Sequence, residues 1–258
     1  MNRLLYLGMP LSLLVFPYVF YSVFDGAGFY FDKESGAVEN ITAVLLAVAI
    51  FFVVRTLWQV HVASAVAFKA ATFAWLAIFG LGCVYFLGEE ISWGQHLFGW
   101  ATPDNWMEIN DQGETNLHNT SGWLDQIPRT VLSLGIIVGG IFCTLLRKWM
   151  GPNQGRIGET FLIHFMPGWN CLIAAACVAG IDLLGGLYSS TGLAWLNISV
   201  GEVKESLIAL FLLVYIVDFS QRMKQPILDP VTTNAGAETK TQDSVLVPDF
   251  GNPTMLNR

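Results

Sequence analysis

The chain contains six apolar runs, each bounded by polar or glycine-containing segments. They cover residues 4–24, 41–54, 70–87, 130–146, 161–184 and 202–219, and the second extends at either end. A helix rises about 1.5 Å per residue, so about 20 residues cross a hydrocarbon layer about 30 Å thick. The pattern predicts an all-α, polytopic membrane protein with about six transmembrane helices.

The composition agrees with a membrane protein. Of 258 residues, 53% are hydrophobic and 13% charged, and the mean hydropathy is +0.52. A soluble domain carries about 25% charged residues, so water is not the main solvent of this chain. The first run follows Arg3 as a secretory signal would, but it is too long for one and no small-residue cleavage site follows. We expect it to be retained as the first helix.

The charges predict an orientation. If Arg3 is cytoplasmic, six spans place most of the basic residues on the same side: Arg3, Arg55, Lys69, Arg147, Lys148, Arg156, Arg222 and Lys224. The opposite side receives residues 25–40 and 88–128, and the second segment has seven acids and no Lys or Arg. The positive-inside rule then predicts a bacterial inner membrane protein with both termini cytoplasmic.

The same charges restrict the partners. Most of the net charge of −7 falls on the outer face, which disfavours nucleic acid and suits cations or metal ions. Membrane lipids and other membrane-protein subunits are the expected partners. We predict a six-helix domain over 1–224, with its outer loop at 88–128. The polar residues 225–258 predict a disordered cytoplasmic tail.

The outer loop begins with two adjacent carboxylates. Glu89 and Glu90 end the third run, and an aromatic stretch with Trp93, Gln95 and His96 follows. Its tryptophans are typical of an interfacial helical segment at headgroup depth. Carboxylates at the membrane edge are costly unless they are paired, solvated or bound to a cation. Further on, Thr102-Pro-Asp predicts a helix start with Thr102 as the N-cap.

A second polar stretch follows at residues 110–119. If it is helical, Glu114 and His118 lie four apart on one face. Carboxylates with an imidazole suit a divalent metal ion such as Zn²⁺, or a general acid/base pair. The spacing matches neither HExxH nor the ExxH of di-iron bundles, and such a pair is often a solvated contact. We predict that Glu114 and His118 point back toward Glu89 and Glu90 in one buried cluster.

Three strings carry a resemblance. Glu-Glu-Ile-Ser-Trp-Gly-Gln at 89–95, Thr102-Pro, and Gln-Gly-Glu-Thr-Asn-Leu-His-Asn at 112–119 resemble a family of uncharacterised bacterial polytopic membrane proteins, as does Gly-Ala-Val-Glu at 36–39. The family places Arg where this chain has His96, which argues against His96 as a ligand. The residues that fit the family pattern become the better candidates: Glu39, Glu89, Glu90, Gln95, Glu114, Asn116, His118 and Asn119. Of these, Glu39, Gln95, Asn116 and Asn119 are expected to assist the site. It implies no activity.

Other polar residues lie near the predicted membrane boundaries. Glu202 is expected as the third residue of a capping box that begins at Ser199, whereas Glu205 is a candidate to join the site. Asp182 is expected to reach Arg129. All four cysteines fall within the apolar runs and none forms a CxxC, so neither a disulfide nor a thiolate metal site is predicted.

Two functions compete, with cation transport ranked behind them because the acids lie at the helix ends. The first is an enzyme that acts on a lipid or lipid-linked substrate, with Glu89, Glu90, Glu114 and His118 as catalytic or metal-binding residues. The second is a non-catalytic subunit or assembly factor that uses the outer loop as a docking surface.

Overall fold

The computed structural model describes residues 3–23, 37–63, 66, 68–110, 113–149, 164–192 and 200–223. All of these belong to one compact unit, Met1–Met223. The predicted disordered tail at 225–258 and the capping residue Ser199 lie outside the described residues.

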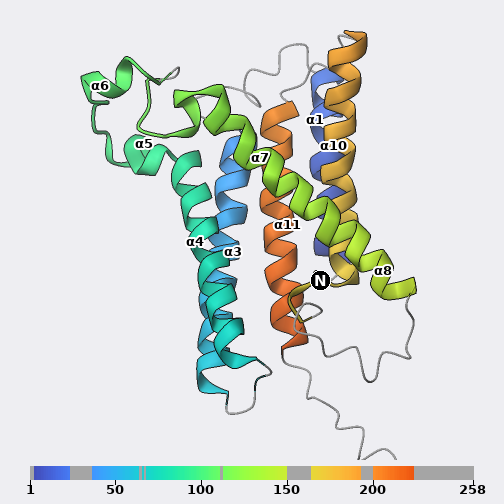
Figure 1. Cartoon of the computed structure of the whole chain (residues 1–258). Coiled ribbons are helices and arrows are strands. Elements are labelled where there is room, and N and C mark those ends of the chain that lie inside the picture. Colours follow the sequence, from blue (N-terminus) through green and yellow to red (C-terminus); the bar gives the residue numbers. More distant parts are fainter. Residues whose placement is uncertain are drawn as a thin grey trace, which may run out of the picture. The chain divides into compact units, whose positions relative to one another are not determined.

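All regular elements in the described part are helical, which confirms the all-α prediction (Figure 1). The long helices are α1 (Met9–Val23), α3 (Ala37–Val62), α4 (Lys69–Glu90), α7 (Gly122–Ile136), α10 (Leu172–Thr191) and α11 (Val200–Arg222). The shorter ones are η1 (Leu4–Gly8), η2 (Ser92–Gly94), α5 (Gln95–Phe98), α6 (Asp104–Met107), η3 (His118–Thr120), η4 (Ile137–Cys143), α8 (Thr144–Trp149) and η6 (Trp169–Cys171).

In the part of the chain that the structure describes, four helical segments are long and apolar enough to cross a membrane. They are α3, α4, the continuous segment Gly122–Leu146, and Trp169–Thr191. Leu4–Pro17 is a shorter apolar helix. Large apolar side chains such as Val44, Phe51 and Leu81 face outward on these helices, as expected when lipid rather than water surrounds the bundle.

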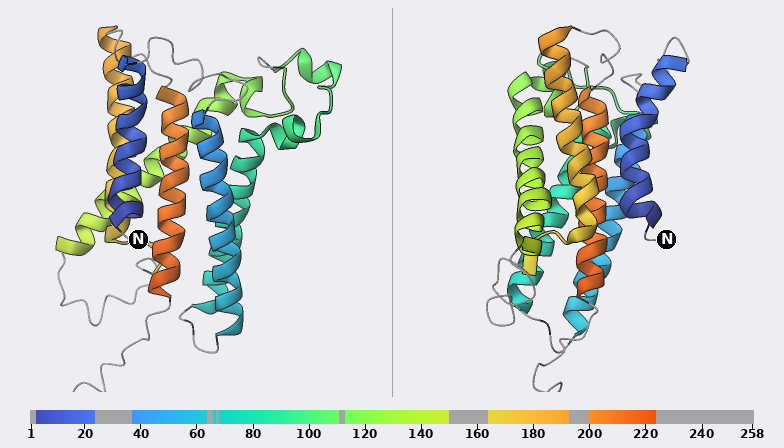
Figure 2. Two further views of the ribbon diagram at one scale, coloured as in Figure 1. Left: turned by 180° about the vertical axis from the view of Figure 1, so that it is seen from behind. Right: turned by 90° about the vertical axis from the view of Figure 1, so that its right-hand side faces the viewer.

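Helix α11 is the centre of the bundle. It packs against α3, α10, α1 and α7, and Figure 2 shows it between the α3–α4 pair and the α1–α10 pair. Its middle, from Leu207 to Val217, is buried nearly all round apart from Leu212. Its charged residues are therefore confined to its two ends, where they face the ends of neighbouring helices.

Helix α7 begins earlier than the sequence predicts. The apolar run starts at residue 130, but α7 starts at Gly122, where the Ser121 hydroxyl accepts a hydrogen bond of 3.2 Å from the Leu124 amide. Residues 122–128, expected in the outer loop, are thus helical. The apolar run does not include these residues because the first turns of α7 mix polar and apolar residues, as an amphipathic helix does.

Candidate active site at the end of α4

Trp93 folds back over the last turn of α4. Ser92 and Trp93 have positive φ angles of 46° and 54°, so the chain reverses sharply and the indole lies against Gly88. A Cβ atom at Gly88 would lie 2.8 Å from the Trp93 ring, so only glycine fits. The indole Nε1 donates a 2.9 Å hydrogen bond to Glu89 Oε1. This turn fixes the position of the first carboxylate.

Glu89 is buried and its oxygens are well occupied. Besides Trp93, the amides of Leu117 and His118 donate hydrogen bonds of 2.7 and 2.9 Å to Oε2. The His118 Nδ1 atom lies 3.5 Å from the same oxygen and is buried without a hydrogen-bond partner. The predicted approach of His118 to Glu89 is confirmed.

Glu114 is also buried, but it belongs to a different network. Its Oε2 accepts hydrogen bonds from the Ser92 hydroxyl at 2.5 Å and from the Asn116 amide at 2.6 Å. The Glu114 amide donates to Asn110 Oδ1 at 3.0 Å. Residues 113–117 are not helical, so Glu114 and His118 do not share a helix face as proposed. Glu114 instead folds the loop against the end of α4.

Gln95 and Thr102 fasten the same loop at a second point. Gln95 Nε2 donates to the Thr102 hydroxyl at 2.6 Å, and Gln95 Oε1 accepts from the Thr115 amide and hydroxyl at 2.8 and 2.9 Å. The Thr102 hydroxyl donates to the Gly113 carbonyl at 2.5 Å. The N-cap of α6 is Pro103, without a side-chain hydrogen bond. The predicted capping role of Thr102 is therefore wrong, because this hydroxyl closes the loop.

The other supporting residues lie around these networks. Asn116 joins the Glu114 network, and its carbonyl and Oδ1 accept from Asn110 Nδ2, both at 2.9 Å. Asn119 is partly buried in η3. Glu39 is partly buried in the first turn of α3, where it interacts electrostatically with Glu202 and Glu114. The side chain of His96 lies outside the described residues.

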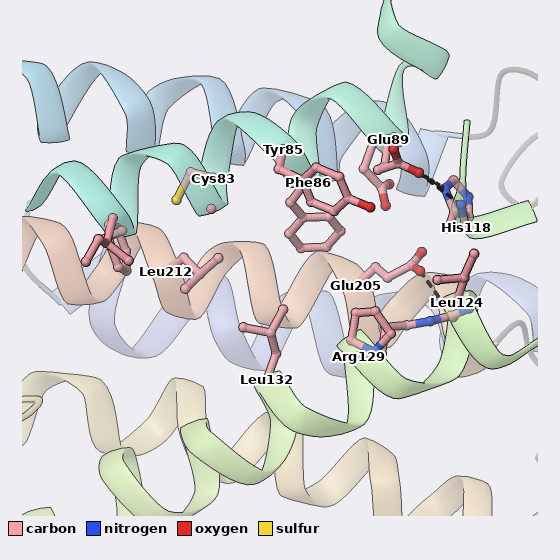
Figure 3. A pocket seen from close by; sticks show the side chains of 15 residues that line it. Cys83, Tyr85, Phe86, Glu89, His118, Leu124, Arg129, Leu132, Glu205 and Leu212 are labelled. Carbon is pink, nitrogen blue, oxygen red and sulfur yellow. Dashed lines mark hydrogen bonds and ion pairs between the residues drawn. The ribbon is translucent and has the colours of Figure 1, made fainter. Parts of the chain in front are cut away.

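A cavity of about 340 Å³ opens beside the Glu89–His118 pair, between α4, α7 and α11 (Figure 3). Its polar end is formed by Glu89, Glu90, His118, Arg129 and Glu205, which we call the α4-end cluster. The rest of its wall is nearly all apolar and consists of Ile78, Phe79, Gly82, Cys83, Tyr85, Phe86, Leu124, Pro128, Leu132 and Leu212. Glu114 does not line it. The cavity thus joins an apolar body to a charged end.

Glu90 differs from its neighbour Glu89. It is 8% exposed and lines the cavity, and within the described residues it makes no hydrogen bond or ion pair. The charges that act on it are those of Glu205, Glu202 and Glu39 and, with opposite sign, that of Arg129. Glu90 is therefore a buried carboxylate in predominantly negative surroundings.

Arg129 is engaged by Glu205 across the cavity. Arg129 Nη1 lies 3.1 Å from Glu205 Oε1, and a dashed line in Figure 3 marks this ion pair. The predicted ion pair between Arg129 and Asp182 is wrong. Asp182 pairs instead with Lys204, whose Nζ lies 2.6 Å from Asp182 Oδ1. Sequence reasoning included Glu205 as a candidate but missed Arg129 as its partner, and it also missed Tyr85 and Phe86. Residues that meet only through tertiary packing leave no spacing signal.

The predicted metal ligands do not converge on one point. Among the described residues, no group of three or more His, Cys, Asp or Glu side chains is arranged to hold a metal ion. Glu89 and His118 meet, Glu90 lines the same cavity, and Glu114 is bound within the loop. Metal binding by these four residues stays a prediction.

No protein-family model, curated protein or solved structure matches this chain. The relationship to other proteins therefore stays a resemblance of short strings. What the chain does has to be argued from the α4-end cluster and its cavity.

Proposed function

We propose that the chain is a membrane-embedded enzyme that acts on a lipid or lipid-linked substrate. One observation carries the proposal: the buried Glu89–His118 pair and Glu90, which has no ion-pair partner among the described residues, share the polar end of an otherwise apolar cavity. Ligand sites are typically apolar concavities with a few convergent polar groups. A substrate with an apolar chain and a reactive polar end has this distribution of polarity.

The chemistry available to the pair is general acid–base catalysis. Glu89 is held by three donors, and its Oε2 lies 3.5 Å from Nδ1 of His118, so the carboxylate charge is fixed beside the ring. The other nitrogen, Nε2, is then the proton acceptor. His118 removes a proton from water or a substrate hydroxyl, the oxygen attacks the electrophilic atom, and the imidazolium returns the proton to the leaving group.

The apolar body of the cavity has room for a hydrocarbon chain. Ile78, Phe79, Leu132 and Leu212 line it and also line a second, almost entirely apolar cavity of about 670 Å³. The second cavity continues along α4, α7 and α11 toward Phe165 and Tyr215. A lipid chain is the natural occupant of such a surface, because it is open to the membrane interior and offers few hydrogen-bonding groups.

We place the site at the outer face of a bacterial inner membrane. In this topology η1–α1 and α11 are the first and sixth spans, and both termini are cytoplasmic. Arg55, Lys69, Lys148 and Arg222 then share the cytoplasmic end. In a chain whose four native cysteines are replaced by serine, a membrane-impermeant maleimide should label Asn105→Cys in intact cells, and His61→Cys only after lysis. The reverse labelling would invert the topology.

The test of the activity uses purified protein in vesicles of phosphatidylethanolamine, phosphatidylglycerol and cardiolipin, with products followed by mass spectrometry. His118→Ala should lower turnover at least about a hundredfold, the usual scale for a general base. His61→Ala is the matched control, since His61 is exposed at the far end of α3. Turnover by His118→Ala equal to that of wild type would overturn the proposal.

Metal analysis of the detergent-purified protein checks the predicted divalent ion separately. A stoichiometric metal in wild type that is lost in Glu90→Gln would add a Lewis acid to the site. The same metal content in both proteins would exclude Glu90 as a necessary ligand.

A docking role is the second candidate, favoured by the loop surface. Leu97, Phe98, Met107 and Ile109 are all more than half exposed on the predicted outer loop, and large exposed apolar patches often mark interaction sites. If the loop docks a subunit, Leu97→Ser with Phe98→Ser should release that subunit and leave the purified chain folded. If the patch contacts only lipid, the two substitutions should leave the size of the complex in mild detergent extracts unchanged.

A further inference from the structure

The α4-end cluster has more negative than positive charge. Glu89 is satisfied by three donors, and Glu205 is paired with Arg129. Glu90 has neither kind of partner among the described residues, although it is more than nine-tenths buried. Burying a carboxylate without a partner lowers the stability of a protein by several kcal/mol, about as much as breaking a buried ion pair. The cavity that Glu90 lines is therefore expected to receive a cationic group.

The aromatic residues at the same end restrict the kind of cation. Tyr85 and Phe86 precede the two glutamates on α4 and line the same cavity, and Figure 3 shows their rings on the Glu89 side of α4. Carboxylates combined with aromatic faces are typical of sites for organic ammonium groups, which are attracted to the ring quadrupole. A bare metal ion would instead need several oxygen or nitrogen ligands around one point, which the described residues do not provide.

We propose that the cavity binds an amphiphile with an ammonium headgroup, which pairs with Glu90 between Tyr85 and Phe86. Its hydrocarbon chain lies along Phe79, Leu132 and Leu212. This deepens the proposed function, on which it rests, by naming the class of substrate. His118 then faces the bonds next to the headgroup, where an ester or amide linkage of such a lipid lies.

Anionic amphiphiles are disfavoured by the same geometry. Arg129 is the cation of the cluster among the described cavity-lining residues, and it is already engaged by Glu205 at 3.1 Å. A phosphate or carboxylate headgroup in place of the ammonium would face Glu90 directly. Like charges at close range in a buried site are unfavourable, so the cavity should discriminate by headgroup charge rather than by chain.

The experiment compares three single-chain probes that share a twelve-carbon tail: dodecylammonium, dodecanol and dodecyl phosphate. Binding to full-length protein in maltoside micelles is measured by isothermal titration calorimetry. Dodecylammonium should bind at least about tenfold more tightly than dodecanol, as expected for one charge-assisted contact, and dodecyl phosphate most weakly. This comparison needs no variant. Equal affinity for the ammonium and the alcohol would overturn the inference.

The variant series assigns the binding to Glu90. Glu90→Gln should remove the preference for dodecylammonium over dodecanol while leaving dodecanol binding unchanged. Glu108→Gln is the matched control, because Glu108 is an exposed carboxylate on the same loop, and it should bind as wild type does. A preference that survives in Glu90→Gln would place the ammonium elsewhere and overturn the assignment. Displacement of dodecylammonium by stoichiometric Mn²⁺ or Zn²⁺ would identify a metal as the natural cation and overturn it too.

Failure of this inference is distinguishable from failure of the proposed function. Suppose that an uncharged or anionic lipid is turned over in a His118-dependent way, but dodecylammonium is not preferred. The proposed enzyme activity is then supported, and the proposed substrate class is wrong. If the ammonium preference depends on Glu90 but no lipid is turned over, the inference stands as a binding site and the catalytic proposal fails.

Discussion

A buried carboxylate lies at each end of α11, Asp218 on α11 itself and Glu90 on the neighbouring α4, and the two differ in their partners. Asp218 near the C-terminal end is 3% exposed and accepts hydrogen bonds from Arg222 Nε at 2.9 Å and Asn170 Nδ2 at 2.7 Å. Arg222 also donates to the carbonyls of His164 and Met166, both at 3.1 Å. At the other end, Glu90 faces a cavity. Saturated partners indicate a structural role, whereas an unsaturated carboxylate at a cavity indicates binding.

Asp218 also lines a hollow, of about 640 Å³, but its two oxygens are already occupied by Asn170 and Arg222. A Cβ atom at Gly168 would collide with Asp218 Oδ2, so the backbone at Gly168 packs directly against the carboxylate. Beside it, the Tyr215 hydroxyl donates to the Phe165 carbonyl at 2.8 Å. These contacts tie the segment before η6 to the end of α11. Glu90 lacks such hydrogen-bond and ion-pair partners among the described residues, and this difference in partners is what the following predictions test.

The largest expected effect is on stability, from Asp218→Ala. The change leaves Arg222 and Asn170 without their common acceptor, so it should destabilise the protein by about 3 kcal/mol, the scale of a broken buried ion pair. Unfolding in mixed micelles measures it. Asp182→Ala is the control, because its pair with Lys204 is more exposed and should contribute less than about 1 kcal/mol. Equal destabilisation by Asp218→Ala and Asp182→Ala would contradict the structural role that we assign to the buried contacts of Asp218.

Glu114→Ala should have a smaller, local effect. It removes the acceptor for Ser92 and Asn116, and each buried donor left unsatisfied costs about 1–3 kcal/mol. The loop should open before the bundle unfolds, so limited proteolysis between Gly99 and Gly122 should accelerate while the thermal unfolding of the helices changes little. Proteolysis at the wild-type rate would show that the loop is held by other contacts.

Glu90→Gln should act in the opposite direction. Because Glu90 is buried and has no partner among the described residues, a neutral side chain of the same shape should raise stability by about 1 kcal/mol. Functional sites commonly contain residues that lower the stability of the fold. A destabilisation as large as that of Asp218→Ala would show that Glu90 has a partner of its own and is structural.

The helices were largely predictable from the sequence, because a lipid-facing helix needs a continuous apolar run and α3, α4 and α10 have one. The start of α7 was missed because Ser121 and the amphipathic turn after it do not resemble such a run. The approach of His118 to Glu89 was also predictable, since a buried carboxylate requires donors and the following loop supplies the nearest ones.

The remaining parts of the site depend on tertiary packing. Glu114 and Asn116 pair with Ser92 because η2 turns back on α4, which requires positive φ angles at residues that ordinarily avoid them. Arg129 meets Glu205 because α7 crosses α11 at that level. Neither contact follows from residue spacing. The sequence therefore indicated which residues are unusual, while the division into loop-holding Glu114 and cavity-lining Glu90 required the fold.

The central claim is that the cavity beside Glu90 and His118 holds a lipid chain, and photo-crosslinking tests it most directly. A lipid with a diazirine in its acyl chain should label Phe79 and Leu212. Gly82→Phe should abolish this labelling, because Gly82 lines the cavity with open space where its Cβ would be. Gly186→Phe on α10, where a Cβ atom also meets nothing within 4 Å, should leave it intact. Labelling confined to outward-facing residues such as Leu81 and Phe51, unchanged by Gly82→Phe, would contradict the account.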